Sequence, residues 1–161
     1  MTEAITRLSS AEVQELLESH QLFCSSAGSE GRRLDLTRFE VHDFCFDGLN
    51  LTEVVAQNAK FHKCSFRGVE WSSGNFDTTT AIQCDFTDAV LVKAEFFESN
   101  LSGSEFVNAN LTRAELIDCD LSDVDFTGAA VKGALISESQ IAGARFDTSA
   151  REEASFEDNR G

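Results

Sequence analysis

The chain has no proline among its 161 residues, and it has only 13 lysines and arginines against 28 aspartates and glutamates. Because proline is the usual source of kinks and cis peptide bonds, we expect neither to interrupt the main chain. The shortage of bases gives a formal net charge of −15. This charge disfavours binding to a membrane surface and direct binding to nucleic acid phosphates.

Other functional signatures are also missing. No apolar run approaches the roughly 20 residues of a membrane span, and residues 1–7 show no apolar segment of a secretory signal, so we expect a cytoplasmic protein. The five cysteines include no Cys-x-x-Cys pair. No nucleophile elbow, phosphate loop or zinc-protease motif occurs, so we expect no enzyme, no catalytic residue and no cofactor.

A five-residue period dominates the remaining sequence. From Leu36 to Phe146 every fifth residue is apolar, and from Ala59 onward the residue two places earlier in each group is small. Five is neither the helical period of 3.6 nor the strand period of 2. A sustained fixed period is typical of repeat architectures, in which each unit buries its apolar side against its neighbours.

Three consecutive groups carry the pattern most plainly: Ala109–Arg113, Ala114–Asp118 and Cys119–Asp123. Here the chain resembles the pentapeptide-repeat family, whose pattern is Ala, Asp or Asn, Leu or Phe, and two variable residues. The resemblance implies an all-β solenoid, a right-handed quadrilateral β-helix with one group per side and about twenty residues per coil. About six coils at the spacing of β-strands would give a rod roughly 30 Å long.

A coil of twenty residues predicts that residues twenty apart stack on one another. One such series is phenylalanine throughout, and we expect an internal ladder of rings there. The ladder consists of Phe46, Phe66, Phe86, Phe106, Phe126 and Phe146. Cys64 and Cys84 are also twenty apart, which places them within disulfide reach. They either form a disulfide or remain two reduced thiols that serve as small core residues.

The chain divides into three parts: residues 1–33, an N-terminal helix and loop; residues 34–150, the β-helix; and residues 151–161, a closing turn and tail. Ser9 followed by Glu12 predicts a capping box at the start of the helix. This short helix would cover the open N-terminal mouth of the tube, with its unpaired strand edges. The alternative is a helix that binds a partner.

Outward-facing positions carry the candidate binding residues. Phe97 and Ile117 are apolar, outward and twenty apart, with Leu135 nearby on the next coil. Such an exposed patch marks a homodimer contact or a protein partner, unless these are tolerated surface residues. With the acidic residues around it, the candidate partner-binding set is Phe97, Ile117, Leu135, Glu95, Glu115, Asp118, Asp120, Asp123 and Asp125.

The acidic run from Glu115 to Asp125 has two interpretations. It is either a solvated surface that keeps the rod soluble or a negative rod that imitates duplex DNA. Some members of the family that the chain resembles protect or inhibit DNA gyrase in this way, but this chain lacks their C-terminal hydrophobic dimerisation helix. We predict a non-enzymatic protein–protein interaction or scaffold module on an acidic β-helical rod. The alternative is a DNA mimic that binds gyrase, topoisomerase or another DNA-binding protein.

His42 and His62 are outward and twenty apart, so we expect them to be adjacent. Zinc normally requires three or four protein ligands. Few acids are near this pair in the sequence, and Lys63 follows His62 directly. We therefore expect no metal site.

Overall fold

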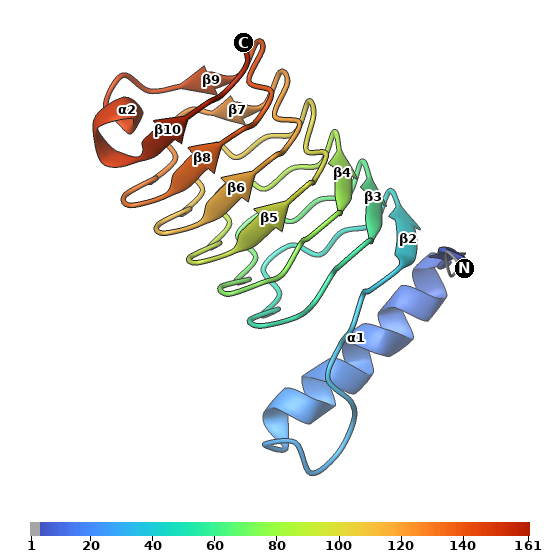
Figure 1. Cartoon of the computed structure of the whole chain (residues 1–161). Helices are drawn as coiled ribbons and strands as arrows, with labels where there is room; N and C mark the ends of the chain where they lie inside the picture. The colour runs from blue at the N-terminus through green and yellow to red at the C-terminus, as the bar shows by residue number, and fades with distance from the viewer. Residues whose placement is uncertain (1–3) are drawn as a thin grey trace.

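The computed structural model describes residues 4–161, and it is a right-handed, four-sided β-helix of about six coils with one helix at its N-terminal end (Figure 1). Its helices are α1 (Ser10–Ser25) and α2 (Ala150–Glu153). Its strands are β1 (Thr6–Arg7), β2 (Phe39–His42), β3 (Lys60–His62), β4 (Thr80–Ile82), β5 (Glu95–Phe97), β6 (Glu115–Ile117), β7 (Asp125–Phe126), β8 (Leu135–Ser137), β9 (Arg145–Phe146) and β10 (Ser155–Glu157). The fold class predicted from the five-residue period is confirmed.

All strand pairs are parallel and, apart from β1 with β2, join residues twenty apart, as Val41 pairs with Phe61 and Phe61 with Ala81. Three sides of the tube carry the sheets. We call them the β2 face (β1, β2, β3 and β4, continued by Asn100 and Asp120), the β5 face (β5, β6, β8 and β10) and the β7 face (β7 and β9). The fourth side is a row of isolated bridges that links Asn50, Glu70, Val90, Asn110 and Ala130.

Corners recur every five residues because a left-handed residue ends each side. Arg113 has φ 59°, and the N–H of Ala114 after it donates to the carbonyl of Leu111 at 2.9 Å. This is a β-turn whose third residue has positive φ. One residue earlier in the pattern, Asn110 Oδ1 accepts the N–H of Thr112 at 3.1 Å. Such side-chain turns are the local reason that Asp and Asn recur beside the central apolar residue.

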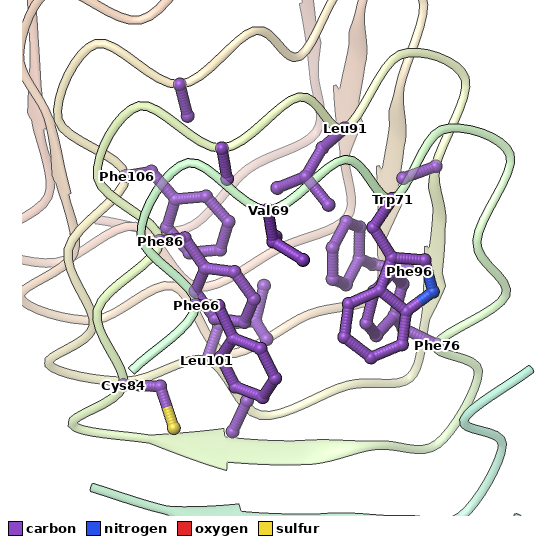
Figure 2. Packing of buried hydrophobic residues seen from close by; sticks show 14 of the residues in the cluster. Phe66, Val69, Trp71, Phe76, Cys84, Phe86, Leu91, Phe96, Leu101 and Phe106 are labelled. Carbon is purple, nitrogen blue, oxygen red and sulfur yellow. The ribbon is translucent and has the colours of Figure 1, made fainter. Parts of the chain in front are cut away.

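The predicted phenylalanine ladder is confirmed, and it runs along the inside of the tube. Successive ring centroids are 4.8, 4.8, 4.7, 5.3 and 4.6 Å apart, and the rings tilt by no more than 25° from one to the next. Figure 2 shows three of these rings in one column, with Phe76 and Phe96 stacked on the other side of the core. Offset aromatic pairs contribute about 0.5–1.5 kcal/mol each beyond the area they bury.

Small inward residues sit where neighbouring backbones approach each other. Ser99 is buried, and its hydroxyl accepts the N–H of Thr79 at 3.1 Å and donates to the carbonyl of Phe76 at 2.6 Å. Cys64 and Cys84 are buried free thiols, so the disulfide alternative is not formed. The serine hydroxyl satisfies main-chain hydrogen-bonding groups, and the small thiols fill the remaining space, so none of these side chains widens the tube.

The helix α1 caps the N-terminal end of the tube. The Ser9–Glu12 capping box is present, as the sequence predicts. Val13 is fully buried in the core of the first coil, and the N–H of Leu34 donates to Nδ1 of the buried His20 at 3.2 Å. The strand β1 pairs with β2 and so covers the first strand edge on this face.

The C-terminal segment returns to the tube. After β9 the short helix α2 replaces a straight side, and β10 then pairs with β8, so that Phe156 lies opposite Ile136. The ring of Phe156 meets Phe146 edge-on at 5.1 Å. The segment that we expected to be a closing turn and tail thus contains a strand in register with the coils.

Lower pH is expected to loosen the cap through His20. Burial lowers the pKa of His20 below its ordinary value of 6.5, because the charged ring loses solvation. The stability that neutral His20 contributes is therefore complete above about pH 6.5 and is lost as the pH falls towards the folded-state pKa. Hydrogen exchange of the α1 amides, corrected for intrinsic rates, should show faster opening at pH 5 than at pH 7. His20→Asn keeps an acceptor without titrating, and an unchanged pH effect in this variant would contradict the assignment.

Candidate partner-binding surface

The β5 face gathers five of the nine candidate residues. Phe97 on β5 pairs with Ile117 on β6, and the neighbouring column runs through Glu95, Glu115 and Leu135. The side chain of Phe97 is 44% exposed, whereas Ile117 and Leu135 are half-buried. The strands hold these side chains on a rigid backbone, because β5, β6 and β8 pair in register from one coil to the next. Phe97 and Ile117 are therefore direct neighbours beside Glu95 and Glu115, and Leu135 lies diagonally from Ile117 on the next strand; we call these three apolar residues the apolar stripe.

Asp118 lies at the corner beside this stripe and belongs to a column of acids. The corner residues one coil before and after it also are acidic, exposed and left-handed. The column, which we call the acidic corner, consists of Glu98, Asp118, Glu138 and Asp158. Adjacent members are one coil apart, about 4.8 Å in rise. Sequence reasoning named only Asp118, although taking every twentieth residue from it finds the other three.

Asp120, Asp123 and Asp125 do not lie on the β5 face. Asp120 continues the β2 face, Asp125 is in β7, and Asp123 occupies the corner between them. The acidic run is contiguous in sequence, but a four-sided coil carries it around half of the circumference.

Two of these three carboxylates serve the local turns. Asp120 Oδ1 accepts the N–H of Ser122 at 3.0 Å, and Asp125 Oδ1 accepts the N–H of Thr127 at 3.0 Å. Burial raises the pKa of Asp125, but hydrogen bonds from Thr127 and the ion pair with Arg145 outweigh it and hold the pKa below its ordinary value. These residues stabilise the coil, and a role in binding would be additional.

The opposite edge of the β5 face is basic. Lys93 and Arg113 are exposed corner residues with φ 57° and 59°, two places before Glu95 and Glu115. Among the described residues, Arg33 forms an ion pair with Glu53, Arg67 with Asp85 and Arg145 with Asp125, and His42 is hydrogen-bonded to Glu40. The acidic corner takes part in none of these pairs, so its charges are available to a partner.

The two predicted neighbours His42 and His62 do stack, with ring centroids 4.6 Å apart. Sequence reasoning missed Glu40, whose Oε1 lies 2.6 Å from His42 Nε2. A residue two places before His42 on a strand points to the same side, so the spacing alone contained the signal. The hydrogen bond from His42 lowers the pKa of Glu40, and burial, together with the nearby charge of His42, lowers the pKa of His62.

A groove of about 330 Å³ separates α1 from the first coil. Leu17, His20 and Cys24 line it from the helix, and Cys45 and Leu49 line it from the coil. Cys24 Sγ lies 3.7 Å from His20 Nε2.

The geometry defines a β-solenoid repeat protein whose exposed side chains stand on a rigid four-sided rod. The family model described as "Pentapeptide repeat region" matches residues 79–156. The same twenty-residue register extends back to Asp35 in the structure. The resemblance to pentapeptide-repeat proteins that the sequence indicates is therefore confirmed over these residues.

Solved structures of this family resemble the chain. A pentapeptide repeat protein from the Arabidopsis thaliana thylakoid lumen is 31% identical, over 58% of this chain and 61% of that one, with a TM-score of 0.49. QnrB1, a plasmid-mediated fluoroquinolone resistance protein, is 22% identical over 78% of this chain and 63% of its own, with a TM-score of 0.56. A pentapeptide repeat protein from Nostoc PCC 7120 is 16% identical, over 96% and 99%, with a TM-score of 0.55.

This chain therefore spans about three fifths of the length of the first two of these structures. At such low identities the likeness to QnrB1 and to the Nostoc protein concerns the fold alone. A search of the curated proteins found no match. Among the described residues, no helix has both the length and the apolar character needed to cross a membrane.

Proposed function

We propose that this chain is a non-enzymatic protein-binding module whose contact surface is the β5 face together with the acidic corner. The observation that carries the proposal is the exposure of Phe97, which stands beside Ile117 on paired strands. Contiguous exposed apolar side chains within a polar rim are typical of protein–protein contact sites. Because the strands already fix the backbone of these residues, less conformational entropy is lost when a partner binds.

The partner should present an apolar side chain with lysines and arginines on the side that meets the acidic corner. One face of a rod about 30 Å long and about 10 Å wide offers less than the roughly 800 Å² that each partner contributes to a standard interface. A partner that binds stably must therefore extend over a corner. The acidic corner has no ion-pair partner among the described residues and would complement a basic surface.

A second copy of the chain fits this surface less well. Each copy carries a net charge of −15, so association must overcome repulsion between the two molecules. If two copies met antiparallel through the β5 face, acidic corner would face acidic corner. A heterologous basic partner avoids both costs.

The alternative function is DNA mimicry. The acidic corner forms a straight line of negative charge along the rod, with one carboxylate about every 4.8 Å. A DNA-binding protein, such as a gyrase or topoisomerase, would bind this line mainly through electrostatic contacts. Salt would then weaken binding steeply, and the apolar stripe would contribute little.

Phe97→Asp is expected to weaken partner binding by at least about thirtyfold, because truncation of a central aromatic contact typically costs about 2 kcal/mol or more. The partner is first isolated by parallel affinity capture with the wild type and the variant, and its dissociation constants are then measured. Val107→Asp is the matched control, since it adds the same charge at a half-buried position near Glu105, which bridges to β7 on another side of the tube. Circular dichroism should show both variants folded.

The same partner distinguishes the two functions. Equal binding by wild type and Phe97→Asp would contradict the proposed contact surface. If affinity instead falls steeply with salt, and if the wild type inhibits gyrase supercoiling at micromolar concentration, the DNA-mimic alternative is supported. Absence of inhibition at that concentration would exclude gyrase as the target.

A further inference from the structure

We propose that Glu40, His42 and His62 form a surface site for a divalent transition-metal ion of the zinc and copper type. Glu40 and His42 come from β2, and His62 comes from β3. One ligand atom from each residue lies within 4.8 Å of the other two. The three side chains are half-buried and share the outer surface of the β2 face.

The backbone register holds these groups together without a metal. His42 pairs directly with His62 across the parallel ladder, and Glu40 pairs with Lys60. Two residues along one strand and one residue on the next therefore form a triangle that the sheet keeps in place. On the following strand, Ile82 pairs with His62 and closes this end of the cluster with an apolar side chain.

The ligand set suits a borderline-soft ion. Two imidazoles and one carboxylate bind Zn²⁺ at about 2.0–2.2 Å, which places ligand atoms about 3.3 Å apart around a tetrahedral ion. Glu40 Oε1 and His42 Nε2 are 2.6 Å apart, joined by a hydrogen bond. Side-chain rotations that bring the three ligand atoms to this spacing would let the ion replace the shared proton, which is released to solvent, and leave a fourth position for water. Imidazole ligands favour Cu²⁺, Ni²⁺ and Zn²⁺ over Mg²⁺ or Ca²⁺.

Neighbouring cations limit the affinity. Arg7 and Lys60 pair with Glu40 on its two sides, and Lys63 follows His62. Their positive charges repel the ion, so we expect binding in the micromolar range rather than that of a closed four-ligand site. The ion would link β2 to β3 and so fasten the first coil, which carries β1, to the second.

Calorimetric titration of the metal-free, untagged full chain with Zn²⁺, and separately with Cu²⁺, tests the site. We expect one ion bound per chain and a higher midpoint of thermal unfolding in its presence. His62→Asn and Glu40→Gln should each weaken binding by about tenfold or more. Circular dichroism without metal should show both variants folded, which separates a lost ligand from a lost fold.

The control is the double variant Cys24→Ser with Cys45→Ser, because these two exposed thiols are the competing ligands for the same ions. It should bind one ion with unchanged affinity. Binding that disappears in this thiol variant but survives in His62→Asn would overturn the proposal. So would the absence of saturable binding of either ion at submillimolar concentration.

Discussion

Phe86→Ala is expected to lower the free energy of unfolding by about 3–5 kcal/mol. Phe86 is fully buried, and its ring stacks on Phe66 at 4.8 Å and on Phe106 at 4.7 Å. The surrounding coils cannot collapse into the space, because ladder hydrogen bonds fix their spacing on both sides of the missing ring. Both neighbouring rings would also lose a stacking partner. Against a typical total of about 5–15 kcal/mol, the loss is large.

Thermal and denaturant unfolding measure this loss. A midpoint lowered by roughly 6–20 °C corresponds to the expected range for a chain of this size. Phe97→Ala is the matched control, because it truncates the same residue type on the outside of the tube and should change stability by about 0.5 kcal/mol or less. Equal losses in the two variants would show that the buried ladder contributes no more stability than an exposed ring does.

Removal of residues 67–86 is expected to leave a folded, shorter rod, whereas removal of Arg67 alone should prevent the later coils from docking on the earlier ones. The longer deletion is one complete coil, so Phe66 would meet Phe106 in the column that Phe86 now occupies. Each coil contacts only its neighbours, and the loss of one leaves the remaining contacts intact. The single deletion moves every later apolar side chain by one position and turns the inward series outward, unless the chain bulges to absorb it.

Circular dichroism and size-exclusion chromatography distinguish these outcomes. The twenty-residue deletion should keep the β-rich spectrum and a cooperative transition, with a lower midpoint because one coil of burial is gone. The single deletion should aggregate or unfold over a broad range. A single-residue variant as stable as the wild type would show that the register is not what specifies the stack.

The proposed binding surface and the proposed metal site are physically separate. Phe97 and Ile117 lie on the β5 face of later coils, whereas Glu40, His42 and His62 lie on the β2 face of the first two. They share no side chain and no element. Variants at one location should therefore leave the other unaffected, as is usual for distant sites without common partners.

Much of the fold could be predicted because its rules are local and repeated. Two inward residues in every five determine which side of the chain is buried, and the phenylalanine column from Phe46 to Phe146 independently predicts the length of a coil. The Ser9–Glu12 box likewise depends on neighbours three residues apart. Such patterns can be interpreted without knowing which distant segments of the chain pack beside them.

The candidate surface was predicted in part. Phe97 and Ile117 lie side by side because they are one coil apart, and Leu135 follows Glu115 in the neighbouring column. Grouping the acids by their position along the chain was less informative, since consecutive groups occupy different sides of the tube. Asp118 stands beside the apolar stripe, but Asp125 lies in β7 and binds Thr127 and Arg145.

By itself, the sequence determined that the chain coils, how many residues make one coil and which side chains fill the tube. It could do so because apolar residues recur with a fixed period along the chain. The twenty-residue period relates Glu98, Asp118, Glu138 and Asp158, but the tertiary structure decided that they stand at the corner beside the β5 face and outside the ion pairs. It also decided the side-chain rotation that brings Glu40 to within 2.6 Å of His42. Such encounters depend on the direction in which each corner turns and on side-chain rotation, and burial does not constrain the rotation of exposed side chains.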